Sequence, residues 1–132
     1  MTRPASASGA LNQQLGRADR LRRKADFEKV YSKGRRVPGR FFIGYLLLRE
    51  RGPLRVGVVA SRRVGDAIRR NRAKRRLREV FRKNKPPGSI AADVVLIARG
   101  AIIEASFEEI GRAYVRGVGR ALEESRRKPE GT

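Results

Sequence analysis

The chain has 132 residues, of which 33 are Lys or Arg and 13 are Asp or Glu, giving a formal charge of +20. This length is typical of a single domain, and positive charge spread along the whole chain indicates a nucleic-acid-binding protein. Because the sequence contains no His and no Cys, it excludes a Ser-His-Asp triad, a Cys-His pair, a disulfide framework and a zinc-cysteine site.

The two ends of the chain lack hydrophobic periodicity. Residues 1–19 are rich in Ala, Ser and Gly, so we expect a disordered N-terminal extension, and residues 125–132 are expected to form a flexible tail. An organellar transit peptide within residues 1–23 is the alternative. The sequence has no apolar signal-peptide region and no run of about 18 apolar residues, so the expected location is the cytoplasm.

The first element after the extension is a helix predicted over residues 24–33. Phe27, Val30 and Tyr31 follow one another at the i, i+3, i+4 spacing that gives a helix one apolar face. Gly34 is expected to end this helix in the C′ position.

Two apolar segments of strand length follow. Residues 40–49 (RFFIGYLLLR) and 54–61 (LRVGVVAS) are separated by the turn 51–53, so the sequence predicts an antiparallel hairpin. Side chains alternate between the two faces of a strand. We therefore expect one face of the first strand to carry Phe41, Ile43, Tyr45 and Leu47.

A basic helix is predicted next, from a cap at Asp66 to about Lys83. In residues 69–78, seven of the ten residues are Arg or Lys. Cationic neighbours at i, i+4 each destabilise a helix by roughly 0.2–0.5 kcal/mol. A polyanion such as a nucleic-acid backbone would offset that repulsion. The opposite, narrow apolar face is expected to pack on a sheet through Ala73, Leu77, Val80 and Phe81.

The last two predicted elements are a buried strand over residues 93–99 and a helix from Ser106 to about Glu124. Ser106 and Glu109 form the capping-box pattern at the start of this helix. The order of helix, strand, strand, helix, strand, helix indicates an α+β sandwich. The expected core positions of the last helix are Ile110, Tyr114, Val115, Val118 and Leu122.

Together these segments resemble the protein subunit of bacterial ribonuclease P. The resemblance covers residues 20–124 and is most specific in residues 70–82 (RNRAKRRLREVFR), which match the family's signature helix. The remaining matches follow in the family's order and spacing: residues 40–45 (RFFIGY), 55–65 (RVGVVASRRVG) and 93–99 (DVVLIAR).

The resemblance implies an α-β-β-β-α-β-α two-layer sandwich similar to the second domain of ribosomal protein S5. It adds a short strand near residues 36–37 and a left-handed βαβ crossover, against the general right-handed rule. It also implies a ribonucleoprotein endoribonuclease whose RNA subunit, using Mg²⁺, removes the 5′ leader from precursor tRNA. This chain would bind the RNA subunit and the leader, and it would hold no catalytic residue, metal ligand or organic cofactor and need no protein partner.

The resemblance assigns two sets of site residues. Guanidinium groups bind phosphates bidentately, and the family's contacts with the RNA subunit correspond to Arg62, Arg63, Arg70, Asn71, Arg72, Lys74, Arg75 and Arg78. Rings beside a basic groove stack unpaired bases, and the family's leader-binding cleft corresponds to Phe27, Tyr31, Ile43 and Tyr45. For these last four residues, ordinary core packing is the alternative.

Two positions depart from the family pattern. Asp66 stands where Asn is usual, which places a negative charge beside the basic loop, and Phe41 stands where a polar residue is common and is expected to widen the aromatic surface. Two other functions stay open: a ribosomal or ribosome-associated RNA-binding protein, and a protein nuclease that acts alone. The lack of His and the scattered acidic residues disfavour the nuclease.

Overall fold

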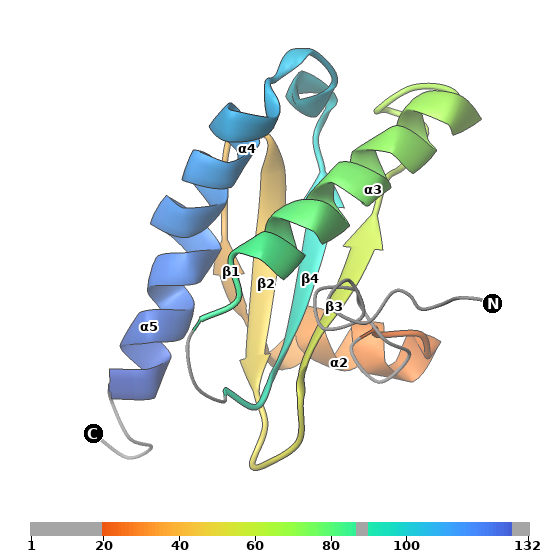
Figure 1. Cartoon of the computed structure of the whole chain (residues 1–132). Helices are drawn as coiled ribbons and strands as arrows, with labels where there is room; N and C mark the ends of the chain where they lie inside the picture. The colour runs from red at the N-terminus through yellow and green to blue at the C-terminus, as the bar shows by residue number, and fades with distance from the viewer. Residues whose placement is uncertain (1–19, 87–89, 128–132) are drawn as a thin grey trace, which may run out of the picture.

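The computed structural model describes residues 20–86 and 90–127 (Figure 1). The predictions for residues 1–19 and 128–132 lie outside these ranges. Residues 125–127, which were expected to belong to a flexible tail, are instead the last residues of a helix, so this part of the tail prediction is wrong. In chain order the elements are α2 (Lys24–Lys33), β1 (Arg35–Val37), β2 (Phe42–Leu48), β3 (Leu54–Val59), α3 (Ala67–Lys83), β4 (Ala92–Ala98), the 3₁₀-helix η2 (Gly100–Glu104), α4 (Phe107–Tyr114), the π-helical turn η3 (Val115–Gly119) and α5 (Arg120–Arg127). This is the predicted α-β-β-β-α-β-α order, with the short extra strand included. No helix in the described ranges is both long and apolar enough to cross a membrane.

The strands form one sheet in the order β1-β2-β4-β3. Strand β4 is antiparallel to β2 and parallel to β3, so the predicted hairpin between residues 40–49 and 54–61 is wrong. The physical reason lies in β4, whose residues 92–96 are all buried. A strand that is apolar on both faces is covered on both faces and belongs in the interior of a sheet, so β4 separates the two strands that adjoin in sequence.

The connection from β3 through α3 to β4 is left-handed. In Figure 1 both strands point upward, α3 lies in front of the sheet, and β4 lies to the left of β3. The resemblance implied this handedness, which the general preference for right-handed crossovers opposes. As a result, α3 begins beyond the β3 edge and runs diagonally back across the sheet.

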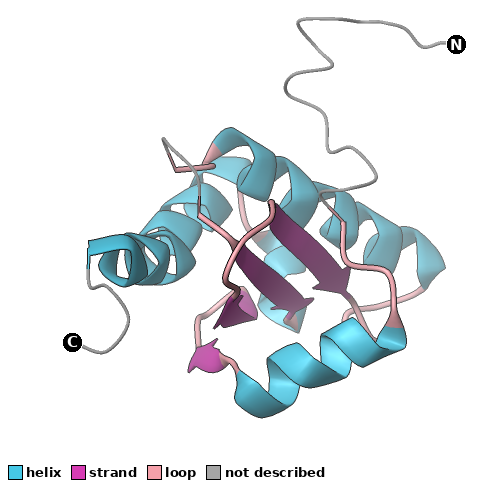
Figure 2. Cartoon of the chain, turned by 90° about the horizontal axis from the view of Figure 1, so that it is seen from below, coloured by secondary structure: helices cyan, strands magenta, loops and turns pink. Residues whose placement is uncertain are grey.

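Helices cover both faces of the sheet (Figure 2). Helices α3, α4 and α5 pack on one face, where even-numbered strand residues such as Phe42, Leu46 and Val94 enter the main core. Helix α2 packs on the other face, against odd-numbered residues such as Tyr45 and Val95. The predicted apolar face of α3 is confirmed, because four of its residues are buried: Ala73, Leu77, Val80 and Phe81.

Phe41 departs from the predicted alternation. It belongs to the main core, with 7 % of its surface exposed, on the face opposite Ile43 and Tyr45. Because Phe41 precedes the first residue of β2, strand alternation does not govern its direction. The expectation that Phe41 widens the aromatic surface is therefore wrong.

Gly34 ends α2, but not in the expected way. Its φ is −83°, so it is extended rather than left-handed. A Cβ at this position would lie 2.5 Å from the carbonyl oxygen of Val30 and 2.9 Å from that of Leu46. Glycine therefore serves here to let the chain pass close to β2 as it leaves the helix.

The last helical segment is continuous from Phe107 to Arg127 but contains a π turn, η3. Ile110, Tyr114, Val118 and Leu122 are fully buried, whereas Val115 is 49 % exposed, so its predicted core position is wrong. The buried residues recur every four positions, a longer spacing than the 3.6 residues of an α-helical turn. The wider π turn takes up this excess and keeps one apolar stripe on the core.

Candidate nucleic-acid interface

The start of α3 is fixed by the loop that precedes it. Asp66 is the N-cap, and its Oδ1 accepts a 3.0 Å hydrogen bond from the backbone N–H of Arg69. Gly65 has a φ of +150°, a conformation that favours glycine. The carboxylate of Asp66 is thus engaged with the helix backbone, while Arg62 and Arg63 of the loop are exposed.

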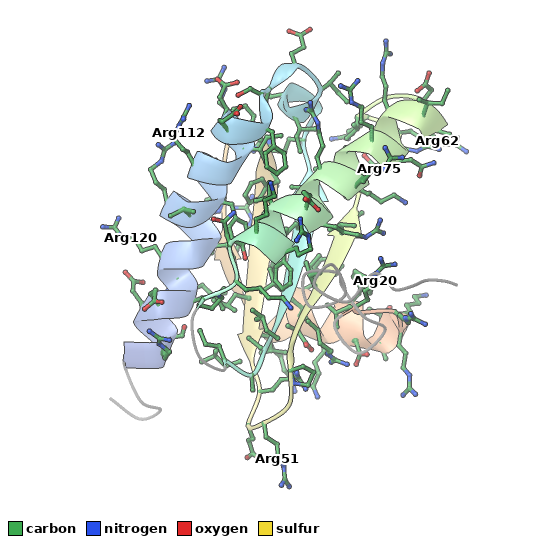
Figure 3. All side chains as sticks on the ribbon, in the orientation of Figure 1. Arg20, Arg51, Arg62, Arg75, Arg112 and Arg120 are labelled. Atoms are coloured by element: carbon green, nitrogen blue, oxygen red, sulfur yellow. The ribbon has the colours of Figure 1, made fainter. Side chains whose placement is uncertain are left out.

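The basic residues predicted to contact RNA spread over the solvent-facing half of α3 and the loop before it (Figure 3). Arg70, Lys74 and Arg78 are half-buried and follow one another at i, i+4, so they form a row along the helix. Burial lowers the pKa of Arg78, and the nearby charge of Arg20 lowers it further. We call the whole set the basic ridge: Arg62, Arg63, Arg70, Asn71, Arg72, Lys74, Arg75 and Arg78.

Two other arginines of α3 are used within the fold. Arg76 Nη1 donates a 2.9 Å hydrogen bond to the carbonyl oxygen of Ala105. Arg82 Nε donates a 3.0 Å hydrogen bond to Glu79, which raises the pKa of Arg82 and lowers that of Glu79. These two side chains therefore differ from the exposed Arg72 and Arg75 of the basic ridge, and Arg76 offers a matched control on the same helix. The half-buried Arg70 also donates a hydrogen bond within the fold, at 3.4 Å to the carbonyl oxygen of Gly65.

The four residues predicted to line a leader cleft meet where α2 crosses the sheet. The ring centroids of Phe27 and Tyr31 are 6.5 Å apart, and those of Tyr31 and Tyr45 are 5.2 Å apart in an edge-on arrangement. Tyr31 is 39 % exposed, and the other three are half-buried. Each of the four therefore presents part of its side chain to solvent. We call this set the aromatic surface: Phe27, Tyr31, Ile43 and Tyr45.

Gly57 of β3 makes the close packing of α2 possible. A Cβ at this position would lie 2.5 Å from Cε1 and Cζ of Phe27 and 3.2 Å from Cβ of Leu21. Any side chain would collide with the Phe27 ring as it is placed. The glycine therefore lets the backbone of β3 approach α2 closely.

Val59 and Ile97, which sequence analysis did not select, extend the aromatic surface. Ile97 of β4 is the register partner of both Ile43 and Val59, so the three form a row across the sheet. All three are half-buried. Strand alternation alone places Ile97 on the same face as Val95, but only the order of the strands places it beside Ile43.

A buried ion-pair cluster anchors α2 to the sheet. Asp93 is 4 % exposed and accepts hydrogen bonds from Arg55 Nε and Nη2, both at 2.8 Å. Arg49 Nε lies 3.1 Å from Oδ1 of Asp93, and Arg55 Nη1 lies 4.0 Å from Oδ2 of Asp26 in α2. The hydrogen bond with Asp93 raises the pKa of Arg55. Through Asp26, the cluster also reaches the helix that carries two of the aromatic side chains.

The basic ridge and the aromatic surface lie on opposite faces of the sheet and approach each other at the β3 edge. Leu21 donates a 2.9 Å backbone hydrogen bond to Val56 of β3, and Arg20 forms a bridge with the same residue. Arg20 therefore lies along this edge, where its charge acts on Arg78. Phosphate-binding and base-stacking groups are thus available to a strand that passes around the edge.

The acidic side chains of the described residues do not gather at one place. Within residues 20–86 and 90–127, no group of three Asp, Glu, His or Cys side chains is placed to hold a metal ion. The chemistry that the two surfaces offer is binding: guanidinium and ammonium groups for phosphates, and rings for unpaired bases.

Comparison with known proteins gives a consistent result. Residues 15–122 match the family described as Ribonuclease P. The ribonuclease P protein component of Symbiobacterium thermophilum is 41 % identical over 97 residues, covering 73 % of this chain and 84 % of that protein. The corresponding protein of Syntrophomonas wolfei is 34 % identical over 101 residues, covering 76 % of this chain and 85 % of that protein.

Solved structures agree with the sequence relatives. The RNase P protein of Staphylococcus aureus superposes with a TM-score of 0.70 at 31 % identity, covering 80 % of this chain and 96 % of that one. The RNase P protein of Thermotoga maritima superposes with a TM-score of 0.66 at 29 % identity, covering 74 % and 92 %. The similarity therefore extends over almost the whole described fold.

Proposed function

The chain belongs to the ribonuclease P protein family, and from this premise we propose that it is the protein component of a ribonucleoprotein that removes the 5′ leader from precursor tRNA. In this proposal the chain binds the RNA subunit and the leader, and it promotes Mg²⁺-dependent cleavage of the bond between leader and mature tRNA. The observation that carries the proposal is the meeting of the basic ridge and the aromatic surface at the β3 edge.

The basic ridge supplies the contact with the RNA subunit. Exposed arginine side chains present planar forks that match phosphate oxygens, and the cations on α3 repel one another until an anion lies between them. Asn71, exposed among them, carries both a donor and an acceptor and can address a base edge or a 2′-hydroxyl.

The aromatic surface supplies the contact with the leader. An unpaired base stacked on a ring contributes about 1–3 kcal/mol without strong sequence preference. The surface is partly exposed, and Phe27 and Tyr45 pack against the buried residues Leu21, Val30 and Val95. Since mature tRNA has no leader, this contact distinguishes substrate from product.

The RNA subunit carries the catalytic step and most of the Mg²⁺ contacts in this proposal. The donor set of the described residues does not fit a resident Mg²⁺ site, because carboxylates do not gather there. The part of this chain is to neutralise phosphates and to position the leader. We assign no metal ligand and no catalytic residue to it.

A salt titration of complex formation tests the proposal. Full-length chain and RNA subunit are combined, and affinity is measured against salt for Arg70→Ala, Arg72→Ala and Arg75→Ala. Each change should lower affinity and reduce the slope of log K against log salt by about one, the value for one lost phosphate contact. Asn71→Ala should lower affinity with the slope unchanged, because it removes no charge.

Arg76→Ala is the matched control for this experiment. It removes the same charge from the same helix, but its hydrogen bond to Ala105 stabilises the fold. We expect its melting temperature to fall while its affinity changes less than for the ridge variants. If the three ridge variants melt lower yet bind RNA like the wild type, the ridge is structural and the proposal fails.

A further inference from the structure

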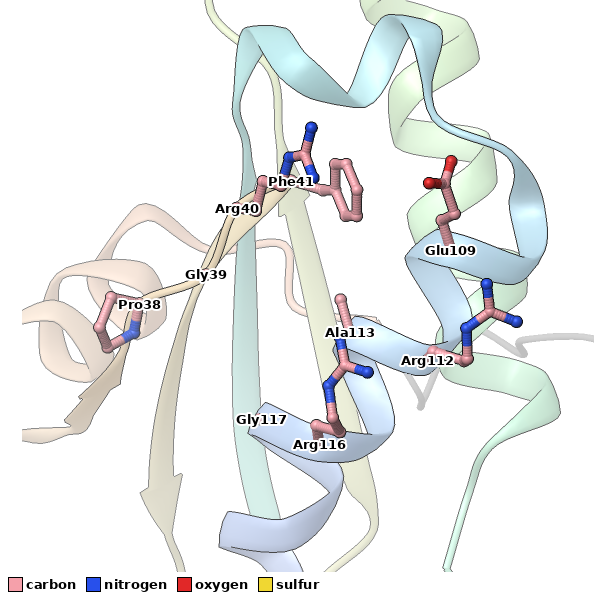
Figure 4. Close-up of a pocket in the computed structure, with 9 residues that line it drawn as sticks. All are labelled: Pro38, Gly39, Arg40, Phe41, Glu109, Arg112, Ala113, Arg116 and Gly117. Atoms are coloured by element: carbon pink, nitrogen blue, oxygen red, sulfur yellow. The ribbon is translucent and has the colours of Figure 1, made fainter.

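A second basic site lies on the far side of the sheet from the β3 edge. The loop between β1 and β2 faces the last helix across a pocket of about 380 Å³ (Figure 4). Arg40 lines it from the loop, while Arg112 and Arg116 line it from α4 and η3. Three guanidinium groups from two elements that are far apart in the sequence therefore surround one hollow.

The charges around this pocket are not balanced. Glu109 is the only acidic residue that lines it, against three arginines. Its Oε1 already accepts a 2.9 Å hydrogen bond from the backbone N–H of Ser106. Within residues 20–86 and 90–127, Arg112 and Arg116 are exposed and make no hydrogen bond or ion pair inside 4.0 Å. Three positive charges against one negative charge leave the pocket with an excess of positive charge.

The local structure keeps the pocket open. Its remaining walls include the small residues Gly39, Ala113 and Gly117. At Gly117, inside the π turn, a Cβ would lie 3.3 Å from Cγ1 of Val37, so a larger residue would press on β1. The same turn follows Arg112 and contains Arg116. π turns occur frequently at functional sites.

The strand register places this pocket at the same end of the sheet as the loop of the basic ridge. Phe42, at the start of β2, is paired with Ala98, at the end of β4, and Val59, at the end of β3, is paired with Ile97. The loops that follow β3 and β4 and the loop that precedes β2 therefore emerge together. Figure 3 shows Arg62 and Arg112 at this one end of the molecule.

Arg99 connects the two basic regions across this end. It follows β4, is exposed, and donates a 3.3 Å hydrogen bond through Nη1 to the carbonyl oxygen of Gly39 in the pocket wall. On its other side, a Cβ at Gly100 would lie 3.9 Å from the carbonyl oxygen of Arg63 in the ridge loop. Arginines thus follow one another from the ridge loop, through Arg99, to the pocket.

We propose that the pocket between the β1–β2 loop and the last helix binds a phosphate group of an RNA backbone, and that the arginines across the end of the sheet lead that backbone from the basic ridge to the pocket. Guanidinium forks match phosphate oxygens bidentately. The cavity is open at the surface, so a phosphate that remains part of a chain can enter it. This inference rests on the proposed function only in naming RNA as the source of the phosphate.

The test compares two exposed arginines of the same helical segment. Arg116→Gln removes a charge from the pocket, and Arg120→Gln removes the same charge one turn further on, outside it. One arm measures binding of the full chain to the RNA subunit, and the other measures binding of precursor tRNA to the assembled complex, each against salt. The arm that responds identifies which RNA supplies the phosphate.

We expect Arg116→Gln to weaken binding about tenfold in one arm, with the salt slope lower by about one. Arg120→Gln should change affinity less than about twofold, and Arg116→Lys should restore the slope because it keeps the charge. Equal effects of Arg116→Gln and Arg120→Gln, no effect of either, or failure of the Lys variant to restore the slope would overturn the proposal. Arg75→Ala is measured alongside, since an unaffected Arg75 variant would indicate failure of the proposed function instead.

Discussion

Gly57 sets how closely α2 approaches the sheet, and one added methyl group there tests the aromatic surface without removing a ring. Gly57→Ala forces the Phe27 ring to move, because the new Cβ would lie 2.5 Å from it. We expect a loss of about 1–3 kcal/mol in unfolding free energy and weaker binding of leader-bearing tRNA. Affinity for the RNA subunit should stay unchanged, as measured by titration of both ligands.

Gly111→Ala is the control for this substitution. Apart from its own helix backbone, nothing in the described part of the chain lies within 4 Å of a Cβ at this position, so alanine should stabilise the fold by about 0.5–1 kcal/mol. If Gly57→Ala leaves leader binding intact while the Phe27 ring is displaced, contact between that ring and the leader is not required.

Phe27 and Tyr45 should distinguish precursor from mature tRNA. Phe27→Ala and Tyr45→Ala are each expected to weaken precursor binding by about 1–3 kcal/mol, the contribution of one stacked base, with mature tRNA nearly unaffected. Tyr45→Phe keeps the ring and should bind like the wild type. Equal weakening for both tRNAs, in variants with normal melting curves, would return these residues to a purely structural role.

At the level of single residues, the sequence predicts which residue types a site contains but not which residues lie next to one another in the fold. The residues of the basic ridge and of the aromatic surface could be selected because they lie in segments that match family motifs. Ile97 and the pairs that Asp93 makes with Arg49 and Arg55 depend on which strands adjoin. Register between distant segments is a tertiary property, so periodicity cannot reveal it.

The capping box at the start of α4 stabilises a single helix, and its contribution to the unfolding free energy can be measured. Ser106 Oγ accepts a 3.0 Å hydrogen bond from the backbone N–H of Glu109, and Glu109 Oε1 accepts a 2.9 Å hydrogen bond from the backbone N–H of Ser106. Ser106→Ala should cost about 1 kcal/mol of unfolding free energy, or about 4 °C in melting temperature. Thermal melts of the full chain at neutral pH measure this.

The same cap gives a pH dependence of known sign. The hydrogen bond from the backbone of Ser106 holds the pKa of Glu109 below its usual value, with smaller contributions from Arg40 and Arg112. A carboxylate whose pKa is lower in the folded than in the unfolded protein stabilises the fold when it is ionised. This stabilisation is fully present above the unfolded pKa of about 4.3, and it is lost as the pH falls through the folded pKa. Glu109→Gln should therefore reduce stability at pH 7, and the difference from the wild type should shrink as the pH falls through the folded pKa of Glu109, as acid titration of stability will check.

Element boundaries were more predictable than element partners. The ranges of α2, α3 and β4 follow from apolar spacing, caps and glycine or proline positions, and the structure agrees within a few residues. The hairpin prediction failed because a short turn at residues 51–53 suggested local pairing, whereas burial of both faces of β4 demands partners on both sides. The π turn was also missed, because a periodicity template assumes a constant 3.6 residues per turn.

The charge of the whole molecule predicts how the holoenzyme responds to Mg²⁺. A partner with a formal charge of +20 replaces counterions around closely packed phosphates. The RNA subunit combined with this chain should therefore cleave precursor tRNA at lower Mg²⁺ than the RNA needs alone. A Mg²⁺ titration of single-turnover cleavage, with and without the chain, measures the shift. Cleavage by highly purified, RNA-free protein would contradict the assignment of catalysis to RNA.

The central place of β4 governs when the chain can fold during its synthesis. After residue 85 has left the ribosome, β2 has only the short β1 as partner and β3 has only the isolated bridge with Arg20, because both await a strand made later. Bringing strands together that are far apart in the sequence costs chain entropy, and only the later burial of apolar side chains offsets this cost. Emergence of residues 92–98 then completes both pairings at once and gives α2 and α3 a common sheet to pack on. We therefore expect the sheet of the nascent protein to form only after β4 has emerged, and the main core to be completed when α4 and α5 follow.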